Sequence, residues 1–428
     1  MNTWIVAIAL SLTVIIFLIV LVLYARGFFR RRTPYRANNL PPPDAPSFAI
    51  TIASLSDSFV EHAQTAGFWV EAEQIFDARL EAIRSAEHSI EFETYIMTPG
   101  RRAEDFAKAI VQKASQGVLV RLLADKYGAK SIPENYWRRL RSAGVEVRIF
   151  NPFSWRDPFY YLRRNHRKLL LIDRKKAFIG GAGVSDDWDG SEEEGYKRPW
   201  YDYEVEFQGS VIARLNGLFL QHWLDAGGTV DLSGVRPQPE SRVQEAIALV
   251  SAGEDPTWRD SGLRSLYQAL VQAARERVWL SSPYFLPDRN TRAVLVAAKR
   301  RGLDVRVITM GHRNDKQFVR YASRELYDEL LQGGVEIYEY QPSMMHAKAI
   351  LIDDAWVSLG SANFDPRSFF QNDELNLSTV EDALIKKVEG LFQDAFSRSR
   401  GISRRDLARR GLRERLVARL SLIFYWEL

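Results

Sequence analysis

Cysteine is absent from this 428-residue chain. Its absence excludes disulfide bonds, thiolate metal sites and a cysteine nucleophile, and it is compatible with a cytosolic environment. A large charge imbalance is also absent, because the formal net charge is only +4. Electrostatic attraction of the whole chain to nucleic acid is therefore not predicted. Histidine is scarce, with six in the chain, so a spacing that two of them share stands out.

The rest of the composition is that of a folded protein. Hydrophobic residues make up 46% of the chain and charged residues 26%. A chain of this length is sufficient for two domains of ordinary size.

The first segment is a run without charge, Trp4–Tyr24. As a helix, its 21 residues would be about 31 Å long, which matches the hydrocarbon core of a bilayer. A cleaved signal peptide is the alternative, but the apolar run is too long for one and no basic segment precedes it. Residues 1–25 are therefore predicted to form a transmembrane anchor.

Residues 26–50 form a basic and proline-rich linker. No Lys or Arg precedes the apolar run. Five arginines of the linker follow it: Arg26, Arg30, Arg31, Arg32 and Arg36. The positive-inside rule then predicts a single-pass protein of the cell (inner) membrane, with its catalytic domain on the cytoplasmic side. The prolines at 41, 42 and 43 predict a stiff, extended spacer.

Histidine, lysine and aspartate recur with one spacing in two places, 180 residues apart. The copies are His166, Lys168 and Asp173, followed by Gly180–Gly183, and His346, Lys348 and Asp353, followed by Gly360–Asn363. On an extended strand, residues i and i+2 face the same side, so each imidazole and ammonium can reach one anion. The other four histidines, His62, His88, His222 and His312, lack a lysine at i+2 and are interpreted as structural.

The chain also repeats around these motifs. Helix–strand patterns at 77–95 and 266–284, strands at 118–123 and 305–309, and strands at 144–150 and 334–340 occur in the same order in each half. Strands alternating with helices predict an α/β fold of two pseudo-repeated lobes with mixed, largely parallel sheets. The predicted boundaries are 51–230 for the first lobe, 231–242 for a linker, 243–400 for the second lobe and 401–428 for a basic amphipathic helix.

The residue types in the two motifs suit phosphodiester chemistry. A phosphodiester is an anion, so a nucleophile approaching it needs nearby positive charge, which Lys168 and Lys348 supply. A neutral imidazole can attack phosphorus, and a protonated one can protonate the leaving alkoxide. Two histidines in different protonation states could complete this cycle, so neither a metal nor a cofactor is expected.

The doubled H-x-K-x4-D motif resembles the phospholipase D superfamily and, within it, the bacterial cardiolipin synthases, over roughly residues 70–400. The resemblance implies two phospholipase D-like lobes whose motifs meet in one site at the lobe interface. It also implies a phosphohistidine mechanism in which His166 is the nucleophile and His346 the acid/base, although the two roles could be exchanged.

The resemblance further implies supporting residues downstream of each motif. Asp202 is expected to hold His166, and Glu374 to hold His346; the alternative is that these carboxylates lie on the surface. Asp173 and Asp353 close their strands and are expected to have structural or supporting roles within the catalytic motifs.

The glycine-rich segments after the motifs differ in one respect. Gly360 and Ser361 let the backbone approach a phosphate closely, and Asn363 presents its amide. Gly183 has no side chain at the equivalent position, so Ser185 or a backbone N–H substitutes for an amide, or the first half contributes less to phosphate binding.

Features outside the motifs favour a lipid substrate. Besides the anchor, an aromatic and arginine-rich insertion at 153–164 suits a headgroup interface, with a packed surface loop as the alternative. Leu412, Leu416, Val417, Leu420, Ile423 and Phe424 recur at helical spacing among arginines, which is typical of a helix lying on an anionic bilayer. The alternative is a helix packed on the core. Residues 200–223 also resemble the stretch that follows the first motif in bacterial cardiolipin synthases.

The predicted function is therefore a membrane-anchored phosphatidyltransferase of the cardiolipin synthase type. It would move a phosphatidyl group between phosphatidylglycerol molecules with release of glycerol. Its partners would be anionic phospholipids and the membrane, with no nucleic acid. The alternatives are a hydrolytic phospholipase D, a transferase that uses another alcohol and, more remotely, a nuclease or a binding module with a dead site.

Overall fold

The computed structural model describes residues 3–25, 37–153, 155, 160–190, 198–231, 245–253, 261–423 and 425. The predicted inter-lobe linker, 231–242, lies outside the described residues except for Asp231. The arginines that follow the predicted anchor lie outside them as well.

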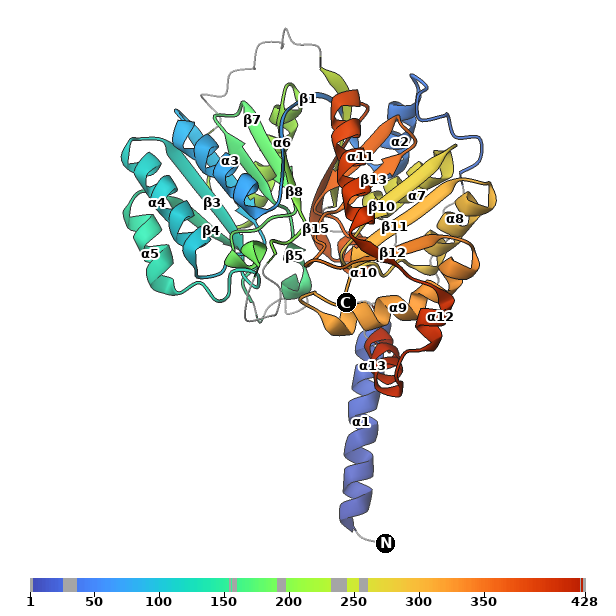
Figure 1. Cartoon of the computed structure of the whole chain (residues 1–428). Helices are drawn as coiled ribbons and strands as arrows, with labels where there is room; N and C mark the ends of the chain where they lie inside the picture. The colour runs from blue at the N-terminus through green and yellow to red at the C-terminus, as the bar shows by residue number, and fades with distance from the viewer. Residues whose placement is uncertain are drawn as a thin grey trace.

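The N-terminal apolar run forms one uninterrupted helix, α1 (Thr3–Ala25). Its segment Trp4–Leu21 has a mean hydropathy of 3.0, and none of it is buried. Figure 1 shows α1 extending away from the two lobes. By length and composition, α1 could span a membrane.

The first lobe follows the predicted order of strands and helices. Its strands are β1 (Phe59–Val70), β2 (Ser89–Thr94), β3 (Leu119–Asp125), β4 (Glu146–Phe150), β5 (Arg164–Asn165), β6 (Leu169–Ile172), β7 (Lys176–Gly180) and β8 (Tyr203–Gln208). Its helices are α3 (Ala72–Ser85), α4 (Arg101–Ser115), α5 (Glu134–Ser142) and α6 (Val211–Asp225), with short 3-10 helices at Tyr160–Leu162 and Asp186–Asp189.

The second lobe repeats this arrangement. Its strands are β9 (Ala246–Gly253), β10 (Arg277–Ser281), β11 (Asp304–Met310), β12 (Glu336–Tyr340), β13 (Ala349–Ile352), β14 (Trp356–Gly360), β15 (Asn372–Thr379) and β16 (Ser399–Gly401). Its helices are α7 (Gly262–Ala273), α8 (Arg289–Arg300), α9 (Gln317–Gln332), α10 (Pro366–Phe370) and α11 (Asp382–Ser397), followed by α12 (Arg404–Ala408) and α13 (Leu412–Ile423).

The strands of both lobes join one continuous mixed sheet. Its order is β16-β12-β11-β10-β13-β14-β15-β9-β1-β8-β7-β6-β2-β3-β4, and β5 pairs with β15 beside this path. The prediction of a mixed α/β fold in two lobes is confirmed, but its detail of largely parallel strands is wrong. Of the fifteen pairings between described strands, ten are antiparallel.

Two of the antiparallel pairings are hairpins that follow the histidines closely. β6 and β7 are joined by Asp173–Lys175, and β13 and β14 by Asp353–Ala355. Asp173 and Asp353 have positive φ angles of 53° and 51°, a conformation that Asp tolerates better than most residues. The parallel part of each lobe is thus limited to the strands that alternate with helices.

The lobes share a hydrophobic core as well as a sheet. One buried cluster combines strand residues of both lobes with Leu215 and Phe219 of α6 and Val388 and Phe392 of α11. Separate clusters lie beneath α3, α4 and α5 in the first lobe and beneath α7, α8 and α9 in the second. Figure 1 shows α6 and α11 near the centre of the molecule, with α4 and α5 on the outer side of the first lobe and α8 on that of the second.

The segment before the first lobe packs against the second. Phe48 and Ile52 of α2 (Phe48–Ser56), which the sequence assigned to the linker and the first lobe, lie in the core beneath α7. The backbone N–H of Ala37 bonds to Oε1 of Gln272 at 3.1 Å. The N–H of Ala45 bonds to the carbonyl of Pro42 at 2.9 Å. This segment is a turn docked on the second lobe, and the prediction of an extended spacer is wrong for it.

Candidate active site

The two motif histidines lie where a strand segment of each lobe bonds to the backbone of the other lobe. The N–H of His166 donates to the carbonyl of Asp373 at 2.9 Å, continuing the pairing of β5 with β15. The N–H of His346 donates to the carbonyl of Tyr201 at 2.8 Å. Each histidine backbone is therefore positioned by the opposite lobe.

The side-chain contacts of the two histidines also cross from one lobe to the other. Nδ1 of His166 lies 2.9 Å from both carboxylate oxygens of Glu374. Nδ1 of His346 lies 2.7 Å from Oδ2 of Asp202. Both predicted carboxylates belong to the site, but their predicted assignment is wrong, because each holds the histidine of the other lobe. With Nδ1 engaged, Nε2 is the ring atom of His166 that faces the substrate, whereas Nε2 of His346 also lies 3.2 Å from Nζ of Lys348.

Hydroxyl groups hold Glu374 in place. Ser361 donates to its Oε2 at 2.5 Å and Ser368 to its Oε1 at 2.8 Å, while Nδ2 of Asn372 lies 3.3 Å from Oε1. Ser361 thus supports a carboxylate rather than pointing at a phosphate. Ser368 and Asn372 carry no spacing signal, and the sequence did not predict them.

Asp202 is held by an indole and a backbone amide. Nε1 of Trp188 donates to its Oδ2 at 2.9 Å, and the N–H of Tyr203 donates to its Oδ1 at 3.0 Å. A Cβ at Gly181 would lie 2.3 Å from this carboxylate, so glycine is required where the chain passes Asp202.

Aromatic rings enclose both imidazoles. The Trp188 and Trp200 rings lie 5.1 and 5.5 Å from the His346 ring, between centroids. The Tyr95 ring lies edge-on to the His166 ring at 5.0 Å. The imidazoles are consequently buried, with 8% of His166 and 4% of His346 exposed. Trp188 and Tyr95 are further site residues that no motif indicated.

The two lysines place positive charge within the same buried volume. Nζ of Lys168 donates to the carbonyl of His166 at 2.7 Å, and Nζ of Lys348 to that of His346 at 2.6 Å. Burial lowers the pKa of Lys168 to about 7, and the charge of Lys348 adds to this. Burial also lowers the pKa of Lys348 to about 8, against the opposing effect of Asp202 and Glu374. Each motif therefore lies within the electrostatic field of the other.

The same field keeps both imidazoles neutral at pH 7. Burial lowers the pKa of His166 well below its usual range, with further lowering by Lys168 and Lys348. Burial and Lys348 lower the pKa of His346 to about 4, although Asp202 opposes the shift. An anionic substrate would raise both pKa values, and at His346 its effect would add to that of Asp202.

The aspartates of the two motifs lie outside the site. Asp173 accepts hydrogen bonds from the N–H groups of Glu87, His88 and Ser89, at 2.6–3.2 Å. Asp353 does the same for residues 275, 276 and 277 of the second lobe, at 2.8–3.3 Å. The motif therefore combines two catalytic candidates with one residue that fixes the entry to β2 or β10. Grouping Asp173 and Asp353 with the catalytic residues of their motifs is therefore wrong, whereas the structural role expected for them fits these contacts.

The glycine-rich turns of the two lobes differ in the polar side chains that they offer to a phosphate. In the second lobe, Oγ of Ser368 accepts the N–H of Asn363 at 3.0 Å, and Oδ1 of Asn363 is buried without a hydrogen bond to any described residue. In the first lobe, the Ser185 hydroxyl bonds to Thr98 and caps the 3-10 helix through Asp187. Ser185 is therefore not available as a substitute for an asparagine.

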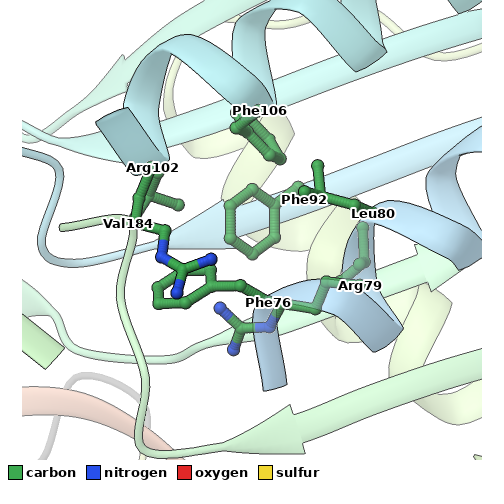
Figure 2. Close-up of a pocket in the computed structure, with 8 residues that line it drawn as sticks. Phe76, Arg79, Leu80, Phe92, Arg102, Phe106 and Val184 are labelled. Carbon is green, nitrogen blue, oxygen red and sulfur yellow. The ribbon is translucent and has the colours of Figure 1, made fainter. Parts of the chain in front are cut away.

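Arg79 fixes the backbone of the first-lobe turn from behind. Its guanidinium donates to the carbonyls of Ala182 and Gly183, at 2.9 and 3.2 Å, and forms a buried ion pair with Glu204. A small cavity of about 10 Å³ lies beside Arg79, with Arg102 and phenylalanine rings in its lining (Figure 2). The cavity has room for about one water molecule, so it is too small to be a substrate pocket.

The aromatic insertion is described only in part, and Arg156 and Phe159 lie outside the described residues. Trp155 is 87% exposed and contacts the Phe153 ring. Nε of Arg163 bonds to Asp373 at 2.9 Å, and the Arg164 guanidinium lies over the Tyr161 ring. These arginines are turned inward, so only the aromatic tip of the described part faces outward.

Among the histidines interpreted as structural, His222 is fully buried and its Nδ1 lies 3.0 Å from Glu93. It packs against the Phe150 ring.

Comparison with known proteins relates both lobes to one family. The family model described as cardiolipin synthase, PLD-like domain matches residues 80–190 and 267–396, which contain one H-x-K-x4-D motif each. Cardiolipin synthase 2 of Bacillus anthracis is 32% identical over 372 residues, covering 86% of this chain and 70% of that protein. Cardiolipin synthase of Geobacillus thermodenitrificans is 34% identical over 355 residues, covering 82% of this chain and 69% of that protein.

Solved structures share the fold at lower sequence identity. Phosphatidylserine synthase of Haemophilus influenzae superposes with a TM-score of 0.67 at 13% identity, covering 89% of this chain and all of that one. Polyphosphate kinase of Porphyromonas gingivalis gives a TM-score of 0.55 at 13% identity, covering 93% of this chain and 57% of that one. At these identities the likeness concerns the fold alone.

Proposed function

The chain belongs to the cardiolipin synthase family with phospholipase D-like domains, and on that premise we propose that it is a membrane-anchored phosphatidyltransferase that makes cardiolipin. Two phosphatidylglycerol molecules would give one cardiolipin and one glycerol. The observation that carries the proposal is the exchanged pair of histidines, each held through Nδ1 by a carboxylate of the opposite lobe beside a buried lysine.

The electrostatics favour His166 as the nucleophile and His346 as the acid/base. Burial and the surrounding cations lower the pKa of His166 well below its usual range, so it stays neutral and its Nε2 lone pair is available for attack. His346 faces Asp202, whose own pKa is lowered by His346 and Lys348 despite the opposing effect of burial. An ionised Asp202 stabilises an imidazolium at His346.

In the first step, Nε2 of His166 attacks the phosphorus of one phosphatidylglycerol. The bond from phosphorus to the glycerol oxygen breaks, and His346, protonated once the bound phosphate has raised its pKa, gives its Nε2 proton to that oxygen. Glycerol leaves, and the phosphatidyl group remains bonded to His166. Lys168 and Lys348 neutralise the charge on the phosphate oxygens during this exchange.

In the second step, a hydroxyl of another phosphatidylglycerol attacks the same phosphorus. His346, now neutral, takes the proton from that hydroxyl, and the bond to His166 breaks. One phosphodiester replaces another, so no nucleotide is consumed.

We assign the missing donor of the first lobe to the backbone N–H of Gly183. Arg79 binds the carbonyl of Ala182, and in a trans peptide the following N–H points the opposite way. A side chain at position 183 would meet the carbonyl of Ile96 at 2.7 Å. Backbone in the first lobe and the Asn363 side chain in the second would then serve one phosphate.

We also assign the protein to the cell (inner) membrane, with α1 as a single span and both lobes on the cytoplasmic side. The support is the apolar helix α1 and the arginines that follow it in the sequence, which the positive-inside rule assigns to the cytoplasm. This location would bring the site to its lipid substrates.

The test is product analysis by mass spectrometry after purified protein is incubated with phosphatidylglycerol liposomes in the presence of a chelator. Cardiolipin and glycerol are expected in equal amounts. Phosphatidic acid without cardiolipin would identify a hydrolase instead, and a product that appears only with another added alcohol would identify a different acceptor. Cleavage of DNA without any lipid product would contradict the proposal.

A further inference from the structure

Helix α13 presents an apolar stripe to the outside. Leu412, Leu416, Leu420 and Ile423 are 85%, 60%, 51% and 49% exposed. Their spacing of four, four and three residues places them on one face of the helix. Isolated exposed leucines are common, but four in one row form a continuous apolar surface.

The other side of α13 is docked on the second lobe. Ala418 is fully buried, and Leu422 packs against the cluster that contains Trp188 and Trp200, the rings beside His346. Glu414 pairs with Arg324 of α9 at 2.9 Å, and Arg410, which precedes α13, pairs with Glu325 of α9 at 2.9 Å. The orientation of the helix is therefore fixed, with its leucine stripe outward.

Arginines border the stripe on both edges. At about 100° per residue, Arg413 projects just beyond one edge and Arg419 just beyond the other. Both are exposed, and the Arg419 side chain is 74% exposed with one distant partner, Glu325 at 3.5 Å. Apolar side chains between two cationic rows match the surface of an anionic bilayer, where acyl chains lie below negatively charged headgroups.

Within the described residues, nothing covers the stripe. The apolar segment of α1 is not buried against it or any other part of the chain. In Figure 1, α13 lies at the end of the molecule from which α1 extends, so a bilayer that contains α1 lies on that side. The continuity with α1 and the charge pattern favour this bilayer over a second copy as the occupant.

We propose that α13 is a second membrane contact, an interfacial helix whose leucine stripe enters an anionic lipid surface while its opposite side contacts the active-site cluster. The proposal rests on the proposed function, because it gives the phosphatidyltransferase a fixed orientation toward its lipid substrates. α1 would hold the protein at the membrane, and α13 would hold the site against it.

The absence of cysteine permits a direct measurement of depth. Leu416→Cys and Leu420→Cys, each carrying a nitroxide in the otherwise unchanged full chain, would be placed in phosphatidylglycerol-containing liposomes. Collision rates with oxygen, which partitions into lipid, and with a water-soluble nickel chelate report the depth of each probe. Leu224→Cys on α6, where Leu224 is 53% exposed, is the control.

Probes at 416 and 420 are expected to collide several-fold more with oxygen, and less with nickel, than the probe at 224. Equal nickel accessibility at all three positions would overturn the proposal. Strong spin–spin broadening at 416 or 420 would identify a second copy as the occupant and would overturn it as well. The depth measurement does not depend on turnover, so it stands even where no cardiolipin is formed.

A functional measurement complements the depth data. The double variant Leu416→Glu/Leu420→Glu is expected to lose about tenfold activity on liposomes, because its apolar face is lost. It should keep wild-type activity on short-chain phosphatidylglycerol below its critical micelle concentration. Leu224→Glu should match wild type on both substrates. Equal losses on both substrates, or no loss on liposomes, would count against the interfacial role.

Discussion

Asp202 and His346 come from different lobes, yet Oδ2 of one lies 2.7 Å from Nδ1 of the other. Glu374 and His166 form the reciprocal contact at 2.9 Å. Both carboxylates are fully buried, and among the described residues no carboxylate of its own lobe forms an ion pair with either of these two histidines.

The exchanged pairing predicts selective effects on the histidine rings. Asp202→Asn is expected to perturb the ring ¹⁵N signals of His346 and leave those of His166 unchanged, while Glu374→Gln should do the reverse. With six histidines in the chain, ¹⁵N-histidine labelling gives few signals to assign. Asp202→Asn should also lower kcat by roughly 10²–10⁴-fold, because the imidazole loses the group that orients it.

The assignment of signals would come from His166→Asn and His346→Asn, each of which removes one set. A change confined to His166 in Asp202→Asn would contradict the exchanged pairing.

The buried lysines predict an alkaline loss of activity. Their pKa values, about 7 for Lys168 and about 8 for Lys348, lie below the usual lysine value. Each ammonium is therefore charged at low pH and becomes neutral as the pH rises through these values, so kcat/KM on phosphatidylglycerol should fall over this interval. Lys168→Arg keeps its charge there and is expected to move part of the fall to higher pH, at a reduced maximal rate.

Lys386→Arg is the matched control, because Lys386 is exposed on α11 and pairs only with Asp382 among the described contacts. Its pH profile should equal that of wild type. Identical alkaline falls in wild type and Lys168→Arg would show that Lys168 does not control this limb.

The contacts of Asp173 predict that replacing it lowers the stability of the fold and not the catalytic rate. Burial alone would raise its pKa, but the backbone N–H groups of Glu87, Ser89 and His88 outweigh burial and lower the value. Asp173→Asn should therefore destabilise the fold by about 1–3 kcal/mol near neutral pH, with kcat of the folded protein close to wild type. The midpoint of thermal unfolding in detergent measures the first effect, and a kinetic assay below that midpoint measures the second.

The direction of the Asp173 pKa shift determines how the stabilisation by Asp173 depends on pH. A lowered pKa in the folded state means that the stabilisation is present above the unfolded value of about 3.9 and is lost as the pH falls through the folded value. The difference between Asp173→Asn and wild type should accordingly shrink in acid. A large loss of kcat without destabilisation would instead place Asp173 in the chemistry.

The close approach of Gly181 to Asp202 predicts that adding a single methyl group at position 181 lowers kcat strongly. Gly181→Ala would bring Cβ within 2.3 Å of the Asp202 carboxylate, so Asp202 must move and kcat should fall by at least about tenfold, since small displacements of catalytic groups are costly. Gly217→Ala on α6 meets no atom within 4 Å. It should leave kcat unchanged and stabilise the fold by up to about 1 kcal/mol. Similar kinetics for the two variants would contradict a specific role of Gly181.

The two lobes could be predicted because the spacing of the repeated motifs is visible in the sequence, and the convergence of the motifs was implied by the family resemblance. His166 with Lys168 and His346 with Lys348 follow the two-residue period of a strand, which is a local property. The order of helices and strands was visible from the same repetition. The hairpin at Asp173 had a weaker signal, a single residue that tolerates a left-handed conformation, so the extent of antiparallel pairing was missed.

The partner of each histidine could not be predicted, because that choice is not local. Asp202 and Glu374 occupy equivalent positions before β8 and within β15, and each is downstream of its own lobe's motif. The pairings between the lobes, β9 with β1 and β5 with β15, bring each carboxylate to the histidine of the other lobe. Trp188 and Tyr95 likewise have meaning only once the tertiary structure is known.

The reciprocal carboxylate contacts have the form of an isologous interface, in which residue i meets j and j meets i about a two-fold axis. Here the two halves of that interface are covalently joined, so its effective concentration is fixed by the chain rather than by the amount of protein. A single lobe would contain a histidine, a lysine and a carboxylate, but the carboxylate would face away from its own histidine. Such a lobe could complete a site only by meeting a second copy, and fusion removes that concentration dependence from catalysis.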